Sequence, residues 1–398
     1  MSSATTVIVG GGVIGLSTAY QLARRDAGRI ILIEKGQLGS GASSRAAGIG
    51  THLLWSETGV RARQLGFQLF REFSTEWDDY TFHDEHGCLN LVSPSEWEAT
   101  AELFEMYDQL GIPYQILDAK EIHYRWPTLC PPENYSGLYD LYGGYSEPDE
   151  YIAALLKRIR QLGVQVFEDE PVVDFLQDRN RLSGVMTSAR TIEADNIIST
   201  VHIWSLPLLS KLELRFPMKA FVHQRYVSKP LPIPWLAPPV NANSYLGYLR
   251  PAFGNRILMG VETPDREEHL PTADFEMNEL STRLDIRDQA KSHLSQLAPV
   301  LKDVSWESES VGLLSFSCDG EPILGPVRQM PGLFVATSFH SGGFSYNAVA
   351  GQLMAELVTE GVTSIDISAF TPDRFDPDKA IDYLATKVPQ FNAVRRRH

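Results

Sequence analysis

The sequence predicts a mixed α/β protein of two domains, an α+β arrangement with each domain discontinuous along the chain. Two observations lead to this prediction. The chain opens with a strand, a glycine-rich turn, a helix and a second strand, which together form a βαβ unit. Elements of the same kind return in residues 146–205 and 310–360, and they interleave with segments of different composition.

The composition is that of an ordinary globular protein. The 398 residues are 43% hydrophobic and 21% charged, enough for two domains. A net charge of −15 argues against nucleic acid or an anionic membrane as partner. Cys88, Cys130 and Cys318 are too widely spaced for a disulfide framework and indicate a reducing compartment. Without a signal-peptide pattern or a long apolar run, we expect a soluble, cytoplasmic protein with no membrane span.

Hydrophobic periodicity and turn residues predict the elements in order. The clearest helix is residues 146–163, which has Ser, Pro and Asp start signals and a glycine stop. The predicted strands are residues 5–9, 29–35, 88–93, a short series between 164 and 200, 223–228, 244–251, 256–263 and 332–339. The predicted helices are residues 13–26, 59–76, 94–111, 146–163, 275–297 and 343–360.

The first turn carries a dinucleotide-binding motif. Gly10, Gly12 and Gly15 form G-x-G-x-x-G between a strand and a helix. The glycines permit a tight turn, close approach of the backbone to a pyrophosphate and close packing of helix and strand. Glu34 ends the second strand, 24 residues after Gly10, where an acid accepts the ribose hydroxyls. This combination predicts a Rossmann-type nucleotide-binding domain.

The segment that follows favours FAD over NAD as the dinucleotide. Residues 36–50 read GQLGSGASSRAAGIG, a long loop of small residues that permits close approach to a ligand. A second glycine-rich turn, SFHSGGFSYNAVAG at residues 338–351, follows a predicted buried strand and opens a helix. The N-terminus of that helix can stabilise negative charge on a reduced flavin.

Several segments together resemble one family. VIVGGGVIGLSTAYQLA, IEKGQLGSGASSRAAG, SYLGYLRP, DGEPILGP and PGLFVATSFHSGGFSYNAVAGQLMAELV occur in this order over nearly the whole chain. They resemble the D-amino-acid oxidase superfamily, in particular its glycine oxidase, sarcosine oxidase and dimethylglycine dehydrogenase branch. The resemblance implies a Rossmann-type FAD-binding domain and a substrate domain whose large antiparallel sheet covers the flavin. It also implies oxidation of a C–N bond by hydride transfer to flavin N5, giving an imine that hydrolyses.

The resemblance and the motifs together divide the chain and assign cofactor contacts. We expect an FAD-binding domain of residues 1–85, 140–215 and 310–365, a substrate domain of residues 86–139 and 216–309, and a C-terminal tail, 366–398, packed on the FAD domain. The expected FAD contacts are Gly10, Gly12, Val13, Ile14, Gly15, Glu34, Lys35, Ser43, Ser44, Arg45, Ala47, Gly48, Val173, Gly342, Gly343, Phe344 and Ser345. Among these, the resemblance places Val173 near the adenine.

The chain departs from its relatives where they attach the flavin covalently. The dimethylglycine dehydrogenase branch carries a histidine where this chain has Arg45, and monomeric sarcosine oxidase uses a cysteine a few residues before the DG turn. Cys318 directly precedes Asp319 and Gly320, which is too close for that role, and is expected to be a packed thiol. We therefore predict non-covalent FAD.

It also departs where relatives bind the substrate carboxylate. The slots for the family's arginine and lysine anchors fall near Leu314, Thr51 and Ser345, none of which is basic. Arg250, Arg225 or Arg45 could replace them, or the substrate lacks a carboxylate. Since Ser345 stands where sarcosine oxidases keep a lysine that helps oxygen react, the electron acceptor could be oxygen, a quinone or a protein.

Four residues are candidates for the catalytic side of the site. Tyr248 and Arg250 alternate along a strand and so share one face of the sheet. His340 lies in the second glycine-rich turn and His52 just beyond the first loop; a histidine can titrate near neutral pH. The HDEH segment at residues 83–86 lacks further clustered ligands, so no metal is expected.

These observations predict an FAD-dependent oxidoreductase acting on the C–N bond of a small or medium amine or amino acid. Two alternatives stay open. Related folds also oxidise the C–O bond of 2-hydroxy acids. The altered anchor positions are also compatible with a non-catalytic flavoprotein that serves as a subunit of a complex.

Overall fold

The computed structural model describes residues 4–262 and 268–386. One of its two large sheets has six strands in the order β19-β20-β13-β1-β2-β9. All neighbouring pairs are parallel except β19 with β20. Its strands are β1 Thr5–Val9, β2 Arg29–Ile33, β9 Gln165–Phe167, β13 Asn196–Ser199, β19 Ile323–Pro326 and β20 Leu333–Thr337. Their near-continuous apolar sequences suit a sheet buried on both faces.

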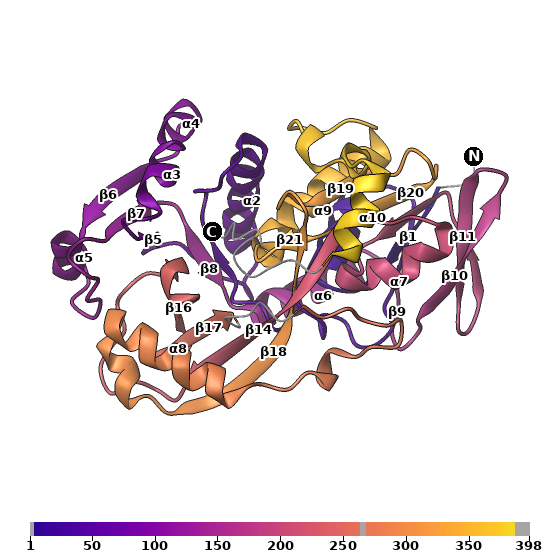
Figure 1. Ribbon diagram of the computed structural model, residues 1–398. Helices are drawn as coiled ribbons and strands as arrows, with labels where there is room; N and C mark the ends of the chain where they lie inside the picture. Colours follow the sequence, from indigo (N-terminus) through magenta and orange to yellow (C-terminus); the bar gives the residue numbers. More distant parts are fainter. Residues whose placement is uncertain (1–3, 263–267, 387–398) are drawn as a thin grey trace.

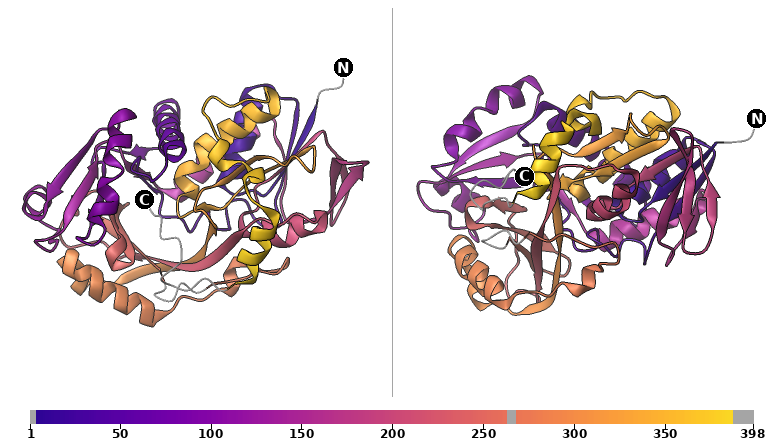
Figure 2. Two further views of the ribbon diagram at one scale, coloured as in Figure 1. Left: turned by 45° about the horizontal axis from the view of Figure 1, so that its top comes forward. Right: turned by 45° about the vertical axis from the view of Figure 1, so that its right-hand side comes forward.

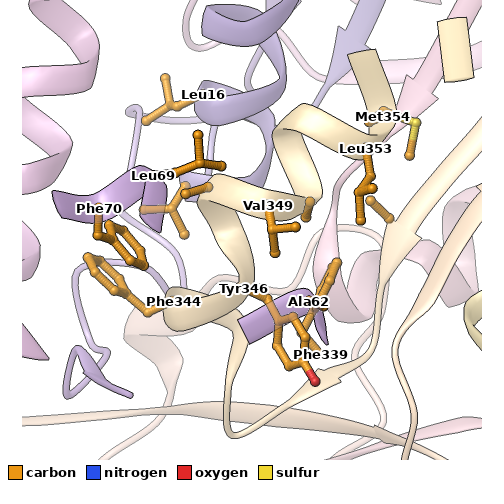
Figure 3. Close-up of a cluster of buried hydrophobic side chains, with 14 of the residues drawn as sticks. Leu16, Ala62, Leu69, Phe70, Phe339, Phe344, Tyr346, Val349, Leu353 and Met354 are labelled. Atoms are coloured by element: carbon orange, nitrogen blue, oxygen red, sulfur yellow. The ribbon is translucent and has the colours of Figure 1, made fainter. Parts of the chain in front are cut away.

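Helices cover the six-stranded sheet and pack on one another. Helix α1 (Val13–Arg24) contacts both α6 (Pro148–Gln161) and α9 (Gly343–Thr359), and α2 (Glu57–Glu76) packs on α9. Most of α9 is buried. Figure 3 shows the contact between α2 and α9, where Phe70 and Phe344 face each other. The predicted helices at residues 13–26, 59–76, 146–163 and 343–360 match these four to within two residues at each end.

The second large sheet has nine strands in the order β21-β18-β14-β17-β16-β15-β5-β7-β6. Neighbours are antiparallel except β15 with β5. Its strands are β5 Cys88–Val92, β6 Tyr114–Asp118, β7 Ser136–Asp140, β14 Met218–Ser228, β15 Val240–Ala242, β16 Gly247–Ala252, β17 Arg256–Glu262, β18 Trp306–Ser317 and β21 Phe339–His340. Helix α8 (Leu284–Leu297) lies on the side of this sheet away from α2 and α9 (Figures 1 and 2).

Smaller elements complete the described part of the chain. Two three-stranded sheets have the orders β10-β11-β12 and β3-β8-β4. Their strands are β3 Ile49–Gly50, β4 Phe82–His83, β8 Gly144–Ser146, β10 Val172–Asp178, β11 Arg181–Thr187 and β12 Thr191–Glu193. The short helices are α3 Trp97–Ala101, α4 Phe104–Gln109, α5 Ala119–Arg125, α7 Ser205–Leu209 and α10 Pro377–Ala385. In the described ranges, no helix combines the length and apolar composition needed to cross a membrane.

Two predicted helices differ from the structure. The segment 94–111 forms α3 and α4, separated at Leu103, whose N–H turns back to the Thr100 carbonyl three residues earlier. The helix predicted from residue 275 begins only at Leu284, because Glu276 and Glu279 cap a separate 3₁₀ turn. Thr263, the end of a predicted strand, and residues 387–398 of the predicted tail lie outside the described residues.

The packing of α9 on α1 generates a stability prediction. A methyl group added to Gly351 would come within 2.5 Å of the Ser17 backbone. Gly351→Ala should therefore lower the free energy of unfolding by about 1–3 kcal/mol in urea titrations. Thr359→Ala, at the exposed end of the same helix, should change it by less than about 0.5 kcal/mol. Equal stability of Gly351→Ala and wild type would contradict this close packing.

Candidate active site

A cavity of about 610 Å³ lies between the edge of the six-stranded sheet and the nine-stranded sheet. This volume falls within the roughly 300–1,000 Å³ of typical ligand sites. Of the residues predicted from the sequence, those that line it are Gly10, Gly12, Val13, Ile14, Glu34, Lys35, Ser43, Arg45, Ala47, Gly48, Val173, Tyr248, His340, Gly343 and Phe344. Those outside its lining are Gly15, Ser44, His52, Arg250, Gly342 and Ser345.

The first glycine turn has the shape of a phosphate cradle. Gly10 has a φ of +108°, and a Cβ on Gly15 would lie 1.9 Å from the Gly10 carbonyl oxygen. Gly15 thus acts by letting α1 approach β1, which explains why it does not line the cavity. Gly12 caps α1 without a side-chain hydrogen bond, so the helix N-terminus points its N–H groups at the cavity. The Val13 N–H donates to Ser43 Oγ at 3.0 Å.

Glu34 is held at the cavity edge by backbone groups. Its Oε2 accepts from the Gly11 N–H at 2.7 Å, and its Oε1 accepts from the Gly36 N–H at 3.0 Å. These bonds fix the carboxylate beside the turn, where a ribose hydroxyl can donate to it. The Glu34 carboxylate and the first glycine turn are therefore held in a fixed position relative to each other.

The cavity lining also contains residues that sequence reasoning missed. They are Trp204, Thr200 and His202, and the Thr200 hydroxyl donates to the Gly10 carbonyl of the first glycine turn. Lys35 Nζ lies 4.4 Å from the centre of the Trp204 ring. Thr200 directly follows β13, at the carboxyl end of a parallel strand. Ligands bind at this edge of such sheets, so the position of Thr200 could have been recognised from the sequence. Trp204 had no such signal.

Three arginines considered as substrate anchors instead hold the loop of residues 36–50. The Arg45 Nε donates to the Val311 carbonyl at 2.9 Å, and Arg225 Nη1 donates to the Ala46 carbonyl at 2.7 Å. Arg250 donates from Nε to the Ala47 carbonyl and from Nη1 and Nη2 to the Glu147 carboxylate, both at 2.8 Å. Arg250 is 1% exposed and does not line the cavity. The expectation that it faces the substrate is thus replaced by a structural ion pair.

Tyr248 reaches the cavity with two neighbours from the nine-stranded sheet. Its hydroxyl lies 3.0 Å from His223 Nε2, and the two rings stack with centres 5.5 Å apart. Asn241 on β15 lines the same wall. His223 is not among the four candidates from the sequence; the pairing across β14, β17 and β16 brings it beside Tyr248.

His52 is engaged inside the protein rather than at the cavity. The backbone N–H of His52 donates to Asp140 Oδ2 at 2.6 Å, and the ring Nδ1 lies 3.1 Å from the same oxygen. Burial tends to raise the pKa of Asp140, but His52 and a hydrogen bond from Thr51 outweigh it and hold this pKa below its usual value. Ser345 Oγ donates to the Ile49 carbonyl and is also buried outside the cavity lining.

His340 forms the cavity wall at the second glycine turn. It is 3% exposed with a φ of 45°, and its Nδ1 accepts from the Gly342 N–H at 3.1 Å. Burial, followed by the charge of Arg63, lowers its pKa well below the ordinary value. The imidazole is therefore neutral at physiological pH, which suits a dry hydrogen-bonding wall. Within the described ranges, no group of three or more His, Cys, Asp or Glu side chains could hold a metal ion.

Comparison with known proteins places the chain in a family. The model of the DAO family, described as FAD dependent oxidoreductase, matches residues 5–357. The chain belongs to this family. The match spans the strands of both large sheets and the first glycine turn, and it makes FAD the cofactor of the protein.

Individual members of the family agree with this assignment. The chain is 28% identical to glycine oxidase of Geobacillus kaustophilus (strain HTA426), over 92% of this chain and 96% of the relative. It is 26% identical to 4-methylaminobutanoate oxidase (formaldehyde-forming) of Paenarthrobacter nicotinovorans, over 93% of this chain but only 45% of that protein. The chain thus spans less than half the length of some relatives. The crystal structure of L-proline dehydrogenase from P. horikoshii shares the fold, with a TM-score of 0.85, 24% identity, and coverage of 94% and 98% of the two chains.

Glu34 gives a test of cofactor binding. Glu34→Gln removes the charge that accepts from Gly11 and faces the ribose site, so the FAD dissociation constant should rise about 10- to 100-fold in titrations of the apoprotein. Glu168→Gln is the matched control, since Glu168 accepts from the Leu38 N–H but does not line the cavity. Equal affinities of Glu34→Gln and wild type would contradict this role.

His202 gives a test of pH dependence. Burial lowers its pKa to about 4, against about 6.5 in the unfolded chain. Between these values the unfolded state binds more protons, so stability should fall as the pH falls, by at most about 1.4 kcal/mol per pH unit. In urea titrations from about pH 7 to pH 5, His202→Gln should show a smaller loss than wild type, whereas exposed His86→Gln should match wild type. Parallel curves of unfolding free energy against pH for His202→Gln and wild type would contradict this role of His202.

Proposed function

We propose that the protein oxidises the C–N bond of a small or medium amine or amino acid. The observation that carries the proposal is the hydrogen-bonded pair of Tyr248 and His223 in the cavity lining, with Asn241 beside Tyr248 on the neighbouring strand and His340 in the same lining. The three relatives reported above are named for oxidation of amines, which supports the same substrate class.

The residues of the cavity lining suit each part of FAD, which supports this cavity as the cofactor site. Gly10, Gly12 and the N-terminus of α1 would hold the pyrophosphate, Glu34 the ribose and Val173 the adenine side. Small side chains of the loop, such as Ala47 and Gly48, leave room for the ring system. When bound, FAD supplies the two-electron acceptor at its N5 atom. We propose that it is held without a covalent bond, because no cysteine lines the cavity within the described residues.

The chain's own groups orient the substrate and keep water out. Tyr248 and His223 form a hydrogen-bonded pair that can accept from, or donate to, a substrate amine. Neutral His340 closes the wall with the apolar ring of Phe339 beside it. Oxidation removes a hydride from the carbon and a proton from the nitrogen; the imine then adds water and splits into a carbonyl compound and an amine or ammonia.

We also propose that the two parts of the chain have different functions, one binding FAD and the other covering the substrate. Residues 1–85, 140–215 and 310–365, which contain the six-stranded sheet together with β21 and most of β18, would carry FAD, and residues 86–139 and 216–309 would roof the substrate. Of the described residues beyond 366, Phe370 is buried in the core of the FAD side, whereas the end of α10 contacts the nine-stranded sheet, because Lys219 on β14 donates to the Thr386 carbonyl. Cys88, Cys130 and Cys318 are free thiols, which supports a reducing compartment such as the cytoplasm.

Anaerobic reduction of the bound flavin tests the proposal. Primary, secondary and N-methyl amines, amino acids and 2-hydroxy acids would be mixed with the holoenzyme without oxygen, and loss of flavin absorbance followed. Reduction by amines or amino acids is expected, and Tyr248→Phe should slow it about 10- to 100-fold by removing one polar contact. Tyr139→Phe, whose hydroxyl donates to the His86 carbonyl outside the cavity, is the matched control.

The other outcomes identify the alternatives. Reduction by 2-hydroxy acids alone would replace C–N by C–O oxidation. Failure of every compound to reduce bound FAD would overturn the enzymatic proposal in favour of a non-catalytic subunit. Admitting air after reduction then decides the acceptor, because rapid reoxidation identifies oxygen and slow reoxidation points to a quinone or protein.

A further inference from the structure

The Asn241 side chain on β15 joins the cavity wall to the protein interior. Asn241 lines the cavity although the residue is only 6% exposed. It lies directly opposite Tyr248 in the antiparallel pairing of β15 with β16, so the two side chains share one face of the nine-stranded sheet. Asn241 Nδ2 donates to Asn90 Oδ1 at 2.8 Å and to Cys88 Sγ at 3.8 Å, and neither partner lines the cavity. Both hydrogens of the Asn241 amide are therefore used inside the protein.

The amide of Asn90 is oriented by groups that can only accept from it. Asn90 Nδ2 donates to the Leu138 carbonyl at 3.3 Å and to Thr51 Oγ1 at 3.4 Å. The Thr51 hydroxyl uses its one proton on Asp140 Oδ2 at 2.8 Å, so its oxygen is an acceptor toward Asn90. Asp140 stays a carboxylate, because burial, which raises its pKa, is outweighed by His52 and by the Thr51 hydrogen bond. A reversed Asn90 amide would place its oxygen against two acceptors.

This series of hydrogen bonds decides which end of the Asn241 amide faces the cavity. Because Asn90 presents its oxygen, Asn241 must present Nδ2 to it, since the reversed amide would bring two oxygens together without a proton between them. In the described ranges, the side-chain hydrogen bonds of Asn241 are those of Nδ2, so Oδ1 remains as an acceptor in the cavity wall. A buried amide oxygen of this kind costs free energy unless a ligand or water donates to it.

We propose that Asn241 Oδ1 accepts a hydrogen bond from an N–H of the substrate, with Asn90 and Thr51 as positioning residues that hold this oxygen toward the cavity. The inference rests on the proposed function and deepens it. A ligand with an acceptor in place of the N–H would face Asn241 oxygen to oxygen, and both groups would stay unpaired. Asn241 would therefore determine specificity for compounds that present an N–H at this point of the wall.

The position of Asn241 favours the substrate over FAD as the donor. FAD also carries an N–H group, at N3 of its ring system. The cavity residues that suit FAD lie on the first glycine turn and in the loop of residues 36–50, whereas Asn241 and Tyr248 lie on strands of the nine-stranded sheet. Tyr248 is the proposed substrate contact, and directly opposite residues of neighbouring strands are close enough to touch one small molecule.

Isosteric ligand pairs test the proposal in the holoenzyme without turnover. Pyrrole-2-carboxamide and furan-2-carboxamide differ at one ring position, which is an N–H in the first and an ether oxygen in the second; the two carboxylates form a second such pair. Their dissociation constants would be measured from the perturbation of the flavin spectrum. Wild type should bind the pyrrole members about 10- to 100-fold more tightly, and Asn241→Leu should reduce this ratio to about 1–3.

Variants of Asn90 and Thr51 test the orientation of the Asn241 amide. Asn90→Ala removes the acceptor of Asn241 Nδ2, so the amide can turn and the preference for the pyrrole members should fall about 10-fold. Thr51→Val removes the hydroxyl at nearly constant volume and should lower the preference about 2- to 10-fold, less than Asn90→Ala because the Leu138 carbonyl still orients Asn90. Thr51→Ser keeps the hydroxyl and should retain the wild-type ratio.

Controls separate this role from folding and from the proposed function. Asn134→Leu removes an exposed asparagine that does not line the cavity, and should show the wild-type ratio. The binding readout is independent of turnover, so wild type can prefer the pyrrole members even if no amine reduces the flavin. Reduction by amines without such a preference, or without binding of either pair, would overturn this inference and leave the proposed function standing.

A structural role or a contact with FAD would give other patterns. If Asn241 only packs, Asn241→Leu would lower the Tm and keep the wild-type ratio of ligand affinities. If Asn241 binds FAD, the variant would weaken FAD binding and again keep that ratio. Either result overturns the proposal. Should Asn241→Leu fail to fold, Thr51→Val and Thr51→Ser decide, because equal ligand ratios in these two variants overturn it as well.

Discussion

The cavity depends on arginines that fasten a loop with almost no side chains of its own. Residues 36–50 are mostly glycine, alanine and serine, so apolar packing alone cannot position them. Arg225 and Arg250 donate from the nine-stranded sheet to the Ala46 and Ala47 carbonyls, while Arg45 reaches from the loop to the Val311 carbonyl on β18. The loop thereby stays close to the nine-stranded sheet, and its small side chains leave the space that the planar ring system of FAD would need. Arg250 is buried and paired with Glu147, so loss of the Glu147 carboxylate would leave the charge of Arg250 without a counterion.

Buried polar contacts also join helices that are far apart in the sequence. Asn347 Oδ1 on α9 accepts from Ser17 on α1 and from the Tyr151 hydroxyl on α6. These bonds set how α9 lies on the six-stranded sheet, and hence where its first residues meet the cavity. Gly343 and Phe344 line the cavity because of this placement, and Phe344 also packs on Phe70 of α2 (Figure 3). Residues of both glycine turns therefore line one cavity.

The electrostatics of the site contrast with those of the whole molecule. The chain carries a net charge of −15, whereas His340 and His202 stay neutral in the cavity wall because burial disfavours their protonated forms. Neutral rings allow the wall to exclude water without adding charge. The positive charge behind this wall comes from Arg63, whose guanidinium lies over the Tyr346 ring and contributes to the low pKa of His340.

The sequence alone determined the βαβ unit, the glycine turn at Gly10 and Gly12, the placement of Glu34 beside it and the four long helices. These features follow from local rules, since glycine spacing, strand periodicity and helix start signals act within a few residues. Tertiary structure decided what Arg250, His52 and Ser345 do, because their partners Glu147, Asp140 and Ile49 lie up to 296 residues away in the chain. It also brought His223 to Tyr248 and placed the buried guanidinium of Arg63 over the Tyr346 ring. Whether a charged side chain is paired or open depends on groups that meet only after folding, and a single sequence does not state which they are.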